Sequence, residues 1–94
     1  MDTKKVTLKF PSQLSYYLNN EKEICFYGEN ILDLINDLDQ KYGNIKEKIV
    51  EEGNVLKPYL TMFIGKENIN SKNGLKTPLK DGNTLTLLLS RAGG

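Results

Sequence analysis

Asn30 to Gly43, NILDLINDLDQKYG, is the stretch of sequence that decides the fold. Apolar residues recur in it at spacings of three and four, which is the pattern of a helix with one buried face. Asn30 suits the N-cap because its side-chain oxygen can accept a hydrogen bond from the first turn, and Gly43 suits the left-handed position after the last turn. The pattern predicts a helix over residues 31–42, with a buried stripe formed by Ile31, Leu34, Ile35 and Leu38.

Strand patterns flank this helix on both sides. Apolar and polar residues alternate in four short segments, each bounded by turn-forming residues. These predicted strands are residues 6–10, 23–27, 60–64 and 84–89. Residues 45–52 predict a further short helix, and residues 12–22 and 73–83 are expected to be connections. Because one helix cannot cover both faces of a sheet, we predict an α+β domain with the helix packed on one face.

Composition excludes several classes of function. The 94 residues suffice for one domain, and 13 basic against 12 acidic residues give a net charge of +1, which lacks the electrostatic footprint of a nucleic-acid binder. No apolar run approaches transmembrane length, and the first ten residues lack the continuous apolar stretch of a signal peptide. With one cysteine, no internal disulfide can form. We therefore expect a cytoplasmic protein that binds neither nucleic acid nor a membrane.

The usual residues of catalysis are also missing from the sequence. There is no histidine, the side chain best suited to proton transfer near neutral pH. One cysteine without histidine excludes the common zinc spacings, and neither a dinucleotide fingerprint nor a P-loop occurs. These absences point away from a stand-alone enzyme and predict no bound cofactor and no metal.

Four acidic or thiol side chains have a chemical and a structural interpretation. Cys25 alternates with apolar neighbours and is expected on the sheet face away from the helix, as a small filler rather than a catalytic thiol. Asp33, Asp37 and Asp39 could form a carboxylate cluster. However, Asp37 and Lys41 stand four residues apart, in the favourable order for an ion pair, so we expect a solvated helix face.

The last predicted strand is followed by Ser90-Arg91-Ala92-Gly93-Gly94, where the sequence ends. Fully extended, these five residues reach roughly 16–18 Å beyond the sheet. Gly93 and Gly94 lack a Cβ atom, so their backbone can lie in a narrow channel and the terminal acyl carbon is open to attack. The alternative interpretation is a disordered end without a function.

This ending, the Asp81-Gly82-Asn83 turn and the strand order together resemble the MoaD/ThiS family of ubiquitin-like sulfur carriers. The resemblance covers essentially the whole chain. Residues 38–45 and the insert up to Pro58 look most like the longer members, which include the CysO-type carriers of cysteine biosynthesis and archaeal MoaD-like proteins. It implies a β-grasp fold with a mixed sheet of four to five strands. Residues 1–89 would form the domain and residues 90–94 a flexible tail.

The resemblance also implies a carrier rather than an enzyme. A ubiquitin-activation-like adenylyltransferase would join the carboxylate of Gly94 to AMP from ATP, and a sulfur donor would then leave a C-terminal thiocarboxylate. Arg91, Ala92 and Gly93 would enter the active site of the partner. The sulfur-accepting enzyme would be the large subunit of a molybdopterin synthase, beside which this chain would be the small non-catalytic subunit. Cysteine synthase, thiamine thiazole synthesis and tRNA thiolation are close alternatives.

The partner interface is expected at Phe63 and Leu88. Both residues should point away from the helix, and exposed apolar side chains on one face often mark a binding surface. The alternative is that residues 11–22 cover them. Arg91 is basic at a place where many relatives of the family have apolar residues. It would suit a partner whose channel mouth is acidic. Two other functions stay open: a protein modifier joined to lysines through Gly94, and a β-grasp interaction module with an inert tail.

Overall fold

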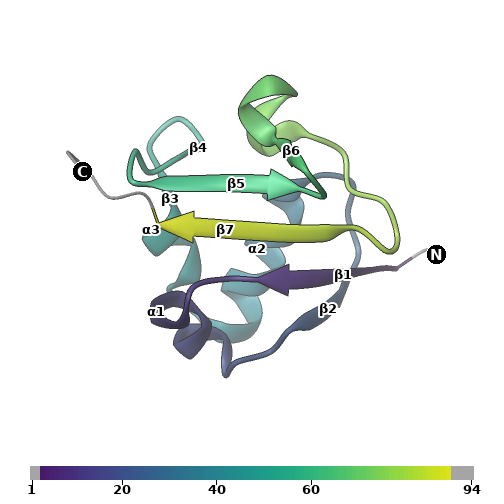
Figure 1. The fold of residues 1–94 in the computed structure, drawn as a ribbon. Coiled ribbons are helices and arrows are strands. Elements are labelled where there is room, and N and C mark those ends of the chain that lie inside the picture. Colours follow the sequence, from purple (N-terminus) through teal and green to yellow (C-terminus); the bar gives the residue numbers. More distant parts are fainter. Residues whose placement is uncertain (1–2, 90–94) are drawn as a thin grey trace.

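The computed structural model describes residues 3–89 of the chain, in which helices cover one face of a sheet (Figure 1). The five strands of the sheet are β1 (Lys4–Lys9), β2 (Glu23–Phe26), β5 (Leu60–Ile64), β6 (Glu67–Asn68) and β7 (Thr84–Leu89). The four strands predicted from the sequence are confirmed, with ends that differ by two residues or fewer. The short strand β6 is additional, and it pairs with the end of β5 after a turn at Gly65.

Strand β7 lies in the middle of the sheet, whose order is β2-β1-β7-β5-β6. It runs parallel to β1 and antiparallel to β5. At the two edges, β2 pairs antiparallel with β1 and β6 pairs antiparallel with β5. Because the sheet holds both parallel and antiparallel pairs, it is mixed, as expected. This topology has a consequence for the site: β1 ends and β5 begins at the same end of the sheet where β7 ends (Figure 1).

The main helix, α2 (Ile31–Tyr42), has the bounds that the sequence predicts. Asn30 caps it, because its Oδ1 accepts a hydrogen bond from the Asp33 N–H (2.9 Å) while Asp33 Oδ2 accepts one from the Asn30 N–H (3.4 Å). Gly43 ends the helix with a φ of +74°, a conformation that glycine adopts without strain. The helix is thus fixed at both ends by residues that the sequence pattern identified.

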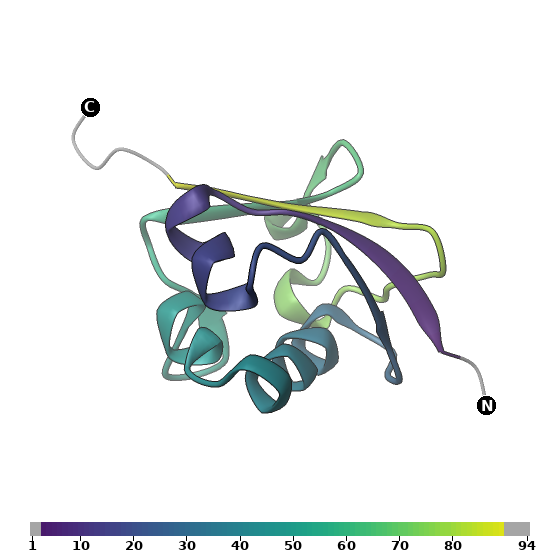
Figure 2. The same ribbon diagram turned by 90° about the horizontal axis from the view of Figure 1, so that it is seen from below.

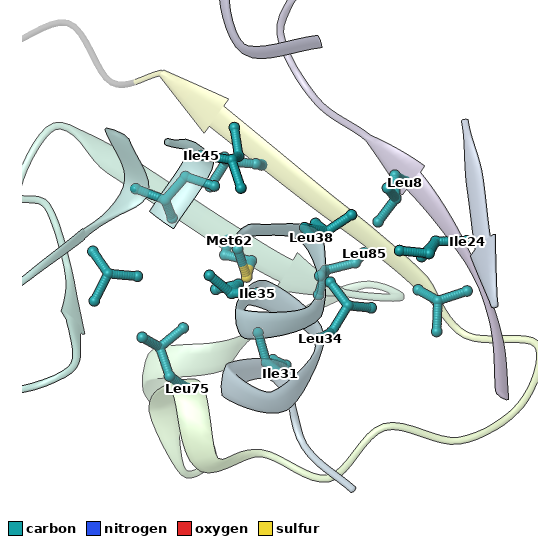
Figure 3. Close-up of a cluster of buried hydrophobic side chains, with 14 of the residues drawn as sticks. Leu8, Ile24, Ile31, Leu34, Ile35, Leu38, Ile45, Met62, Leu75 and Leu85 are labelled. Atoms are coloured by element: carbon teal, nitrogen blue, oxygen red, sulfur yellow. The ribbon is translucent and has the colours of Figure 1, made fainter. Parts of the chain in front are cut away.

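The core lies between α2 and the inner face of the sheet (Figures 2 and 3). The predicted helix stripe is fully buried, and it faces buried side chains from four strands. These strand residues are Val6, Leu8, Ile24, Phe26, Leu60, Met62, Leu85 and Leu87. Phe10 and Ile64, which continue the same alternation along their segments, are partly buried at the margin of the core. Each large buried side chain contributes roughly 1.5–3 kcal/mol, so this interface holds the domain together.

The prediction of a short helix over residues 45–52 is wrong at its C-terminal end. Helix α3 (Ile45–Ile49) stops after five residues, and the chain continues as β3 (Val50–Glu51), which pairs with β4 (Val55–Leu56). Gly53 and Asn54 both have positive φ values, so they turn the chain back tightly enough to form this hairpin. The local turn therefore ends the helix after Ile49, three residues earlier than predicted.

The connections contribute more to the core than the sequence indicated. Residues 12–22 contain α1 (Ser12–Ser15) and the 3-10 helix η1 (Tyr16–Leu18), and the segment before β7 contains η2 (Ile69–Ser71) and η3 (Gly74–Lys76). They bury Leu14, Leu18, Ile69, Leu75 and Leu79. One helix is too narrow to cover a five-stranded sheet, so these short turns close its sides. Among residues 3–89, no helix has both the length and the apolar character needed to cross a membrane.

Candidate functional site

The reactive group expected from the sequence lies beyond β7. Arg91, Ala92, Gly93 and Gly94 all fall outside the described residues, as does the whole predicted tail over residues 90–94. The structure describes the root of this segment, which is strand β7 up to Leu89. The candidate site is therefore built from this root and from the surface that surrounds it.

The root is held from both sides. Strand β7 pairs with β5 along nearly its whole length, up to Leu60 opposite Leu89, and with β1 over residues 84–86. Leu85 and Leu87 are fully buried against α2. Withdrawing the strand would break two ladders of hydrogen bonds and expose both leucines, so the starting point of the tail is fixed relative to the sheet.

The turn over residues 81–83 sets the register of this strand. Asp81 Oδ1 accepts a hydrogen bond from the Lys5 N–H (2.7 Å), and the Gly82 N–H donates to the Lys5 carbonyl oxygen (2.8 Å). The Thr7 N–H then donates to the Asn83 carbonyl oxygen (2.9 Å). These bonds tie the turn to β1, and so they fix the register in which β7 enters the sheet.

A substitution at Gly82 should destabilise the protein, because the φ of Gly82 is +90°, in the region that residues with a Cβ avoid. No atom lies within 4 Å of where a Cβ would be, so the cost of Gly82→Ala is backbone strain alone. We expect this substitution to lower the free energy of unfolding in urea by about 1–2 kcal/mol. Lys80→Ala, at an exposed position in the same turn, should stay within about 0.5 kcal/mol of the unaltered protein. Equal stability of the two variants would contradict the assigned role of Gly82.

The predicted positions of Phe63 and Leu88 are confirmed. Both lie on the open face of the sheet, away from α2, with Phe63 opposite Thr86 and Leu88 opposite Thr61. Phe63 is half-buried and Leu88 is 49% exposed, so residues 11–22 leave much of Leu88 uncovered. Cys25 is on the same face and is exposed. The role of Phe63 and Leu88 in partner binding stays a prediction.

The three aspartates of α2 have separate structural roles. Asp33 closes the capping box. Asp37 forms an ion pair with Lys41 (3.3 Å between Oδ2 and Nζ), as the spacing predicted. Asp39 Oδ1 accepts a hydrogen bond from the Lys46 N–H (3.0 Å) and so stabilises the start of α3. These contacts support the structural interpretation of the cluster over the catalytic one.

A cleft of about 560 Å³ lies along α2, and these aspartates line it together with Tyr27, Gly28 and Gln40. Its carboxylates are the ones already engaged in capping and pairing. Within residues 3–89, no three His, Cys, Asp or Glu side chains are grouped so that they could hold a metal ion.

Two residues beside the root were not identified from the sequence. Leu89 shares the helix-facing side of β7 with Leu85 and Leu87, yet it is 40% exposed. Tyr59, immediately before β5, is 43% exposed. Their exposure depends on how far neighbouring segments extend over the end of the sheet. The only available signal was the position of Leu89 at the very end of an apolar strand.

A mixed sheet with a central last strand, covered on one face by a single long helix, defines a ubiquitin-like protein of the β-grasp class. No protein-family model matches the chain. The chain is 31% identical to a putative sulfur carrier protein of Archaeoglobus fulgidus over 89 residues, which cover 95% of this chain and 98% of that protein. It is 26% identical over 91 residues to the sulfur carrier protein CysO of Mycobacterium tuberculosis, covering 95% of this chain and 98% of CysO.

Solved structures give the same assignment. The structure is similar to a chain of the Amycolatopsis orientalis BexX/CysO complex, with a TM-score of 0.82, 31% identity, and coverage of 95% of this chain and 99% of that one. It is also similar to small archaeal modifier protein 1 of Methanosarcina acetivorans, with a TM-score of 0.76, 27% identity and full coverage of both chains. The chain belongs to the family of ubiquitin-like sulfur carrier proteins, in the CysO-like branch, and is a carrier rather than an enzyme.

Proposed function

We propose that this protein carries sulfur as a thiocarboxylate at Gly94. In the first step, a carboxylate oxygen of Gly94 attacks the α-phosphorus of ATP on a partner adenylyltransferase, and pyrophosphate leaves. In the second step, a sulfide or persulfide sulfur attacks the carbonyl carbon of the acyl adenylate, and the bond to AMP breaks. With a persulfide donor, the attack leaves an acyl disulfide, and a second thiol must attack the donor sulfur, forming a disulfide with it and releasing the thiocarboxylate. The product of these steps is a C-terminal thiocarboxylate, whose nucleophilic sulfur an acceptor enzyme can use.

The residues of this chain would supply position rather than proton transfer. The central placement of β7 fixes the point from which the tail departs, and this is the observation that carries the proposal. Gly93 and Gly94 have no Cβ atom, so two successive peptide units can pass through a channel too narrow for other residues. Arg91 and Ala92 would enter the same channel. ATP, the metal that accompanies it and the catalytic side chains would belong to the partner.

For the pathway, we propose cysteine biosynthesis, with an enzyme of the cysteine synthase type as the sulfur acceptor. Similarity to two CysO proteins supports this choice over molybdopterin synthase, which the sequence alone placed first. Similarity over nearly the full length of the chains supports a common way of presenting the tail. The solved BexX/CysO complex supports the view that a CysO-like chain works by docking on a second protein.

The proposal predicts a defined chemical change at the chain end. We expect intact-mass spectrometry of the protein purified from its source to show a species heavier by the difference between one sulfur and one oxygen atom. Tandem fragmentation should place the change at Gly94. As a control, a variant lacking Gly93 and Gly94 should retain the fold and show no such species. A protein that its cognate adenylyltransferase does not adenylate with ATP would contradict the proposal and favour an inert module.

A second candidate function is covalent modification of lysines through Gly94. The similarity to small archaeal modifier protein 1 favours it. The same mass measurement separates the two functions, because a modifier should appear in adducts joined by an amide bond to lysine side chains of other proteins. Hydroxylamine separates them further, since it cleaves thioesters and acyl adenylates much faster than amide bonds.

A further inference from the structure

Asn73, in the turn immediately before η3, differs from the other asparagines of the chain. No other asparagine of the sequence is followed by glycine. Asn73 is exposed, and its side chain makes no capping hydrogen bond. By contrast, the side-chain oxygens of Asn30, Asn68 and Asn83 each accept a hydrogen bond from a backbone N–H, at 2.9, 2.8 and 2.8 Å. The side-chain amide of Asn73 is therefore open to attack at its carbonyl carbon, Cγ.

The backbone nitrogen of Gly74 is the group placed to make this attack. Within residues 3–89, the Gly74 N–H donates no hydrogen bond to another residue. Glycine has no side chain, so nothing on its own Cα shields the nitrogen. The space beside that Cα is also open, because no atom lies within 4 Å of where a Cβ would be. An unhindered backbone nitrogen thus directly follows an exposed side-chain amide.

Thr77 holds these two residues in a conformation that cannot react. The Asn73 N–H donates to Thr77 Oγ1 (3.1 Å), and the Thr77 hydroxyl donates to the Gly74 carbonyl oxygen (2.7 Å). The Lys76 N–H also donates to the Asn73 carbonyl oxygen (3.0 Å). In this turn the ψ of Asn73 is 27°, which points the Gly74 nitrogen away from the Asn73 Cβ. A five-membered ring between them can close only after this bond rotates, so η3 must first open.

We propose that Asn73 is a site of spontaneous deamidation, and that the Thr77 hydroxyl controls its rate by keeping η3 closed. The Gly74 nitrogen gives up its proton to solvent base and attacks Asn73 Cγ. The bond from Cγ to the side-chain nitrogen then breaks, and ammonia leaves with a proton from water. Water opens the resulting cyclic imide at either carbonyl carbon, giving aspartate or isoaspartate at position 73. This inference does not depend on the proposed function.

The isoaspartate product is the one that should damage the fold. Its main chain passes through the former side-chain carbon and is longer by one methylene group. Leu75 and Thr77, which follow, are buried, and the Thr77 carbonyl oxygen accepts a hydrogen bond from the Ile31 N–H (3.1 Å) at the start of α2. A longer chain cannot keep both the turn and these contacts, so this product should unfold at a lower temperature. Aspartate keeps the chain length and is a preferred residue before a helical turn.

Peptide mapping by mass spectrometry tests the site on the full-length protein aged at mildly alkaline pH. In water enriched in heavy oxygen, each residue converted during ageing gains one heavy oxygen atom, which distinguishes it from aspartate already present. Asn54 is the internal control, because it is also exposed in a turn but precedes Val55. We expect the converted fraction at Asn73 to exceed that at Asn54 about 10-fold or more, since the branched Val55 side chain shields the attacking nitrogen.

Thr77→Val tests the control by the hydroxyl group. The substitution deletes two hydrogen bonds of the closed turn, so Asn73 should deamidate about 5-fold faster or more. Thr77→Ser is the matched control, since it keeps a hydroxyl that can donate and accept, and its rate should stay within about 2-fold of that of the unaltered protein. The isoaspartate form, separated by chromatography, should melt at a lower temperature than Asn73→Asp, which reproduces the aspartate product.

Circular dichroism establishes that each variant is folded before the rates are compared. If Thr77→Val fails to fold, urea below the unfolding transition of the unaltered protein replaces it, because more frequent opening of η3 should also speed the reaction. Deamidation at Asn73 no faster than at Asn54 would overturn the assignment of the site. A rate that neither the loss of the hydroxyl nor urea changes would overturn the role of Thr77.

Discussion

Adding a single alanine after Gly94 is expected to reduce adenylation by the partner enzyme at least about 100-fold, because a misplacement of about 1 Å at a reacting centre is enough to cost that factor. The added residue moves the carboxylate roughly 3.3–3.6 Å further along the channel. It also places a Cβ next to the reacting carbon, where Gly94 has none. The tail cannot compensate by sliding backward, since β7 is held in register by β1 and β5 and by the turn at Gly82.

The measurement is ATP–pyrophosphate exchange or direct detection of the acyl adenylate, with the cognate adenylyltransferase in excess. The matched control is the same alanine added before Met1, which changes the mass equally and leaves the C-terminal carboxylate in place. Its adenylation should equal that of the unaltered protein. If the C-terminally extended protein were adenylated at the normal rate, the reacting group would not be the terminal carboxylate at a fixed distance from Leu89, and the proposed function would fail.

The features that could be predicted from the sequence are those set by local patterns. The spacing of the four aliphatic residues after Asn30 and the glycine that follows Tyr42 determined the bounds of α2. Alternation of apolar and polar residues placed the four main strands and put Leu88 and Phe63 on the open face. In each of these cases the information lies within about ten consecutive residues, and the tertiary structure agrees with the local preference.

The features that could not be predicted depend on residues far apart in the chain. The segment before β7 reads as a run of turn formers, yet Thr77 and Leu79 are buried there. The Thr77 carbonyl oxygen accepts a hydrogen bond from the Ile31 N–H (3.1 Å), and the Leu79 N–H donates to the Glu29 carbonyl oxygen (2.8 Å). These bonds join the segment to the start of α2 across more than forty residues of sequence. No local pattern encodes such a contact.

The candidate site divides in the same way. The tail and its glycines were read directly from the sequence, and they lie outside the described residues. The exposure of Leu89 could not be predicted, because it reflects what the rest of the fold leaves uncovered. Leu85, Leu87 and Leu89 have the same side-chain type and alternate on one face, but only the first two are fully buried. What the rest of the fold covers, rather than residue type, therefore separates the two buried leucines from the exposed one.

Phe26→Ala should have the largest effect on stability among single truncations near the edge of the sheet. Phe26 is 2% exposed at the end of β2, and its ring lies in the core cluster under α2. Removing a buried phenylalanine ring typically lowers the free energy of unfolding by about 3–5 kcal/mol, because the lost burial is joined by the cost of the cavity. The total for a domain of this kind is about 5–15 kcal/mol, so the variant should be near the limit of stable folding.

Tyr27→Ala is the matched control for this variant, since the next residue along the chain carries a ring of similar size that is 69% exposed. Its free energy of unfolding, measured by urea denaturation, should stay within about 0.5 kcal/mol of the unaltered protein. The kinetics then link stability to function: because the reacting group would lie in the tail and not in the core, the folded fraction of Phe26→Ala should be adenylated with unchanged kcat and KM. Equal destabilisation by the two substitutions would contradict the assigned packing of β2, whereas a changed kcat per folded molecule would show that the core positions the tail more directly than the strand pairing alone implies.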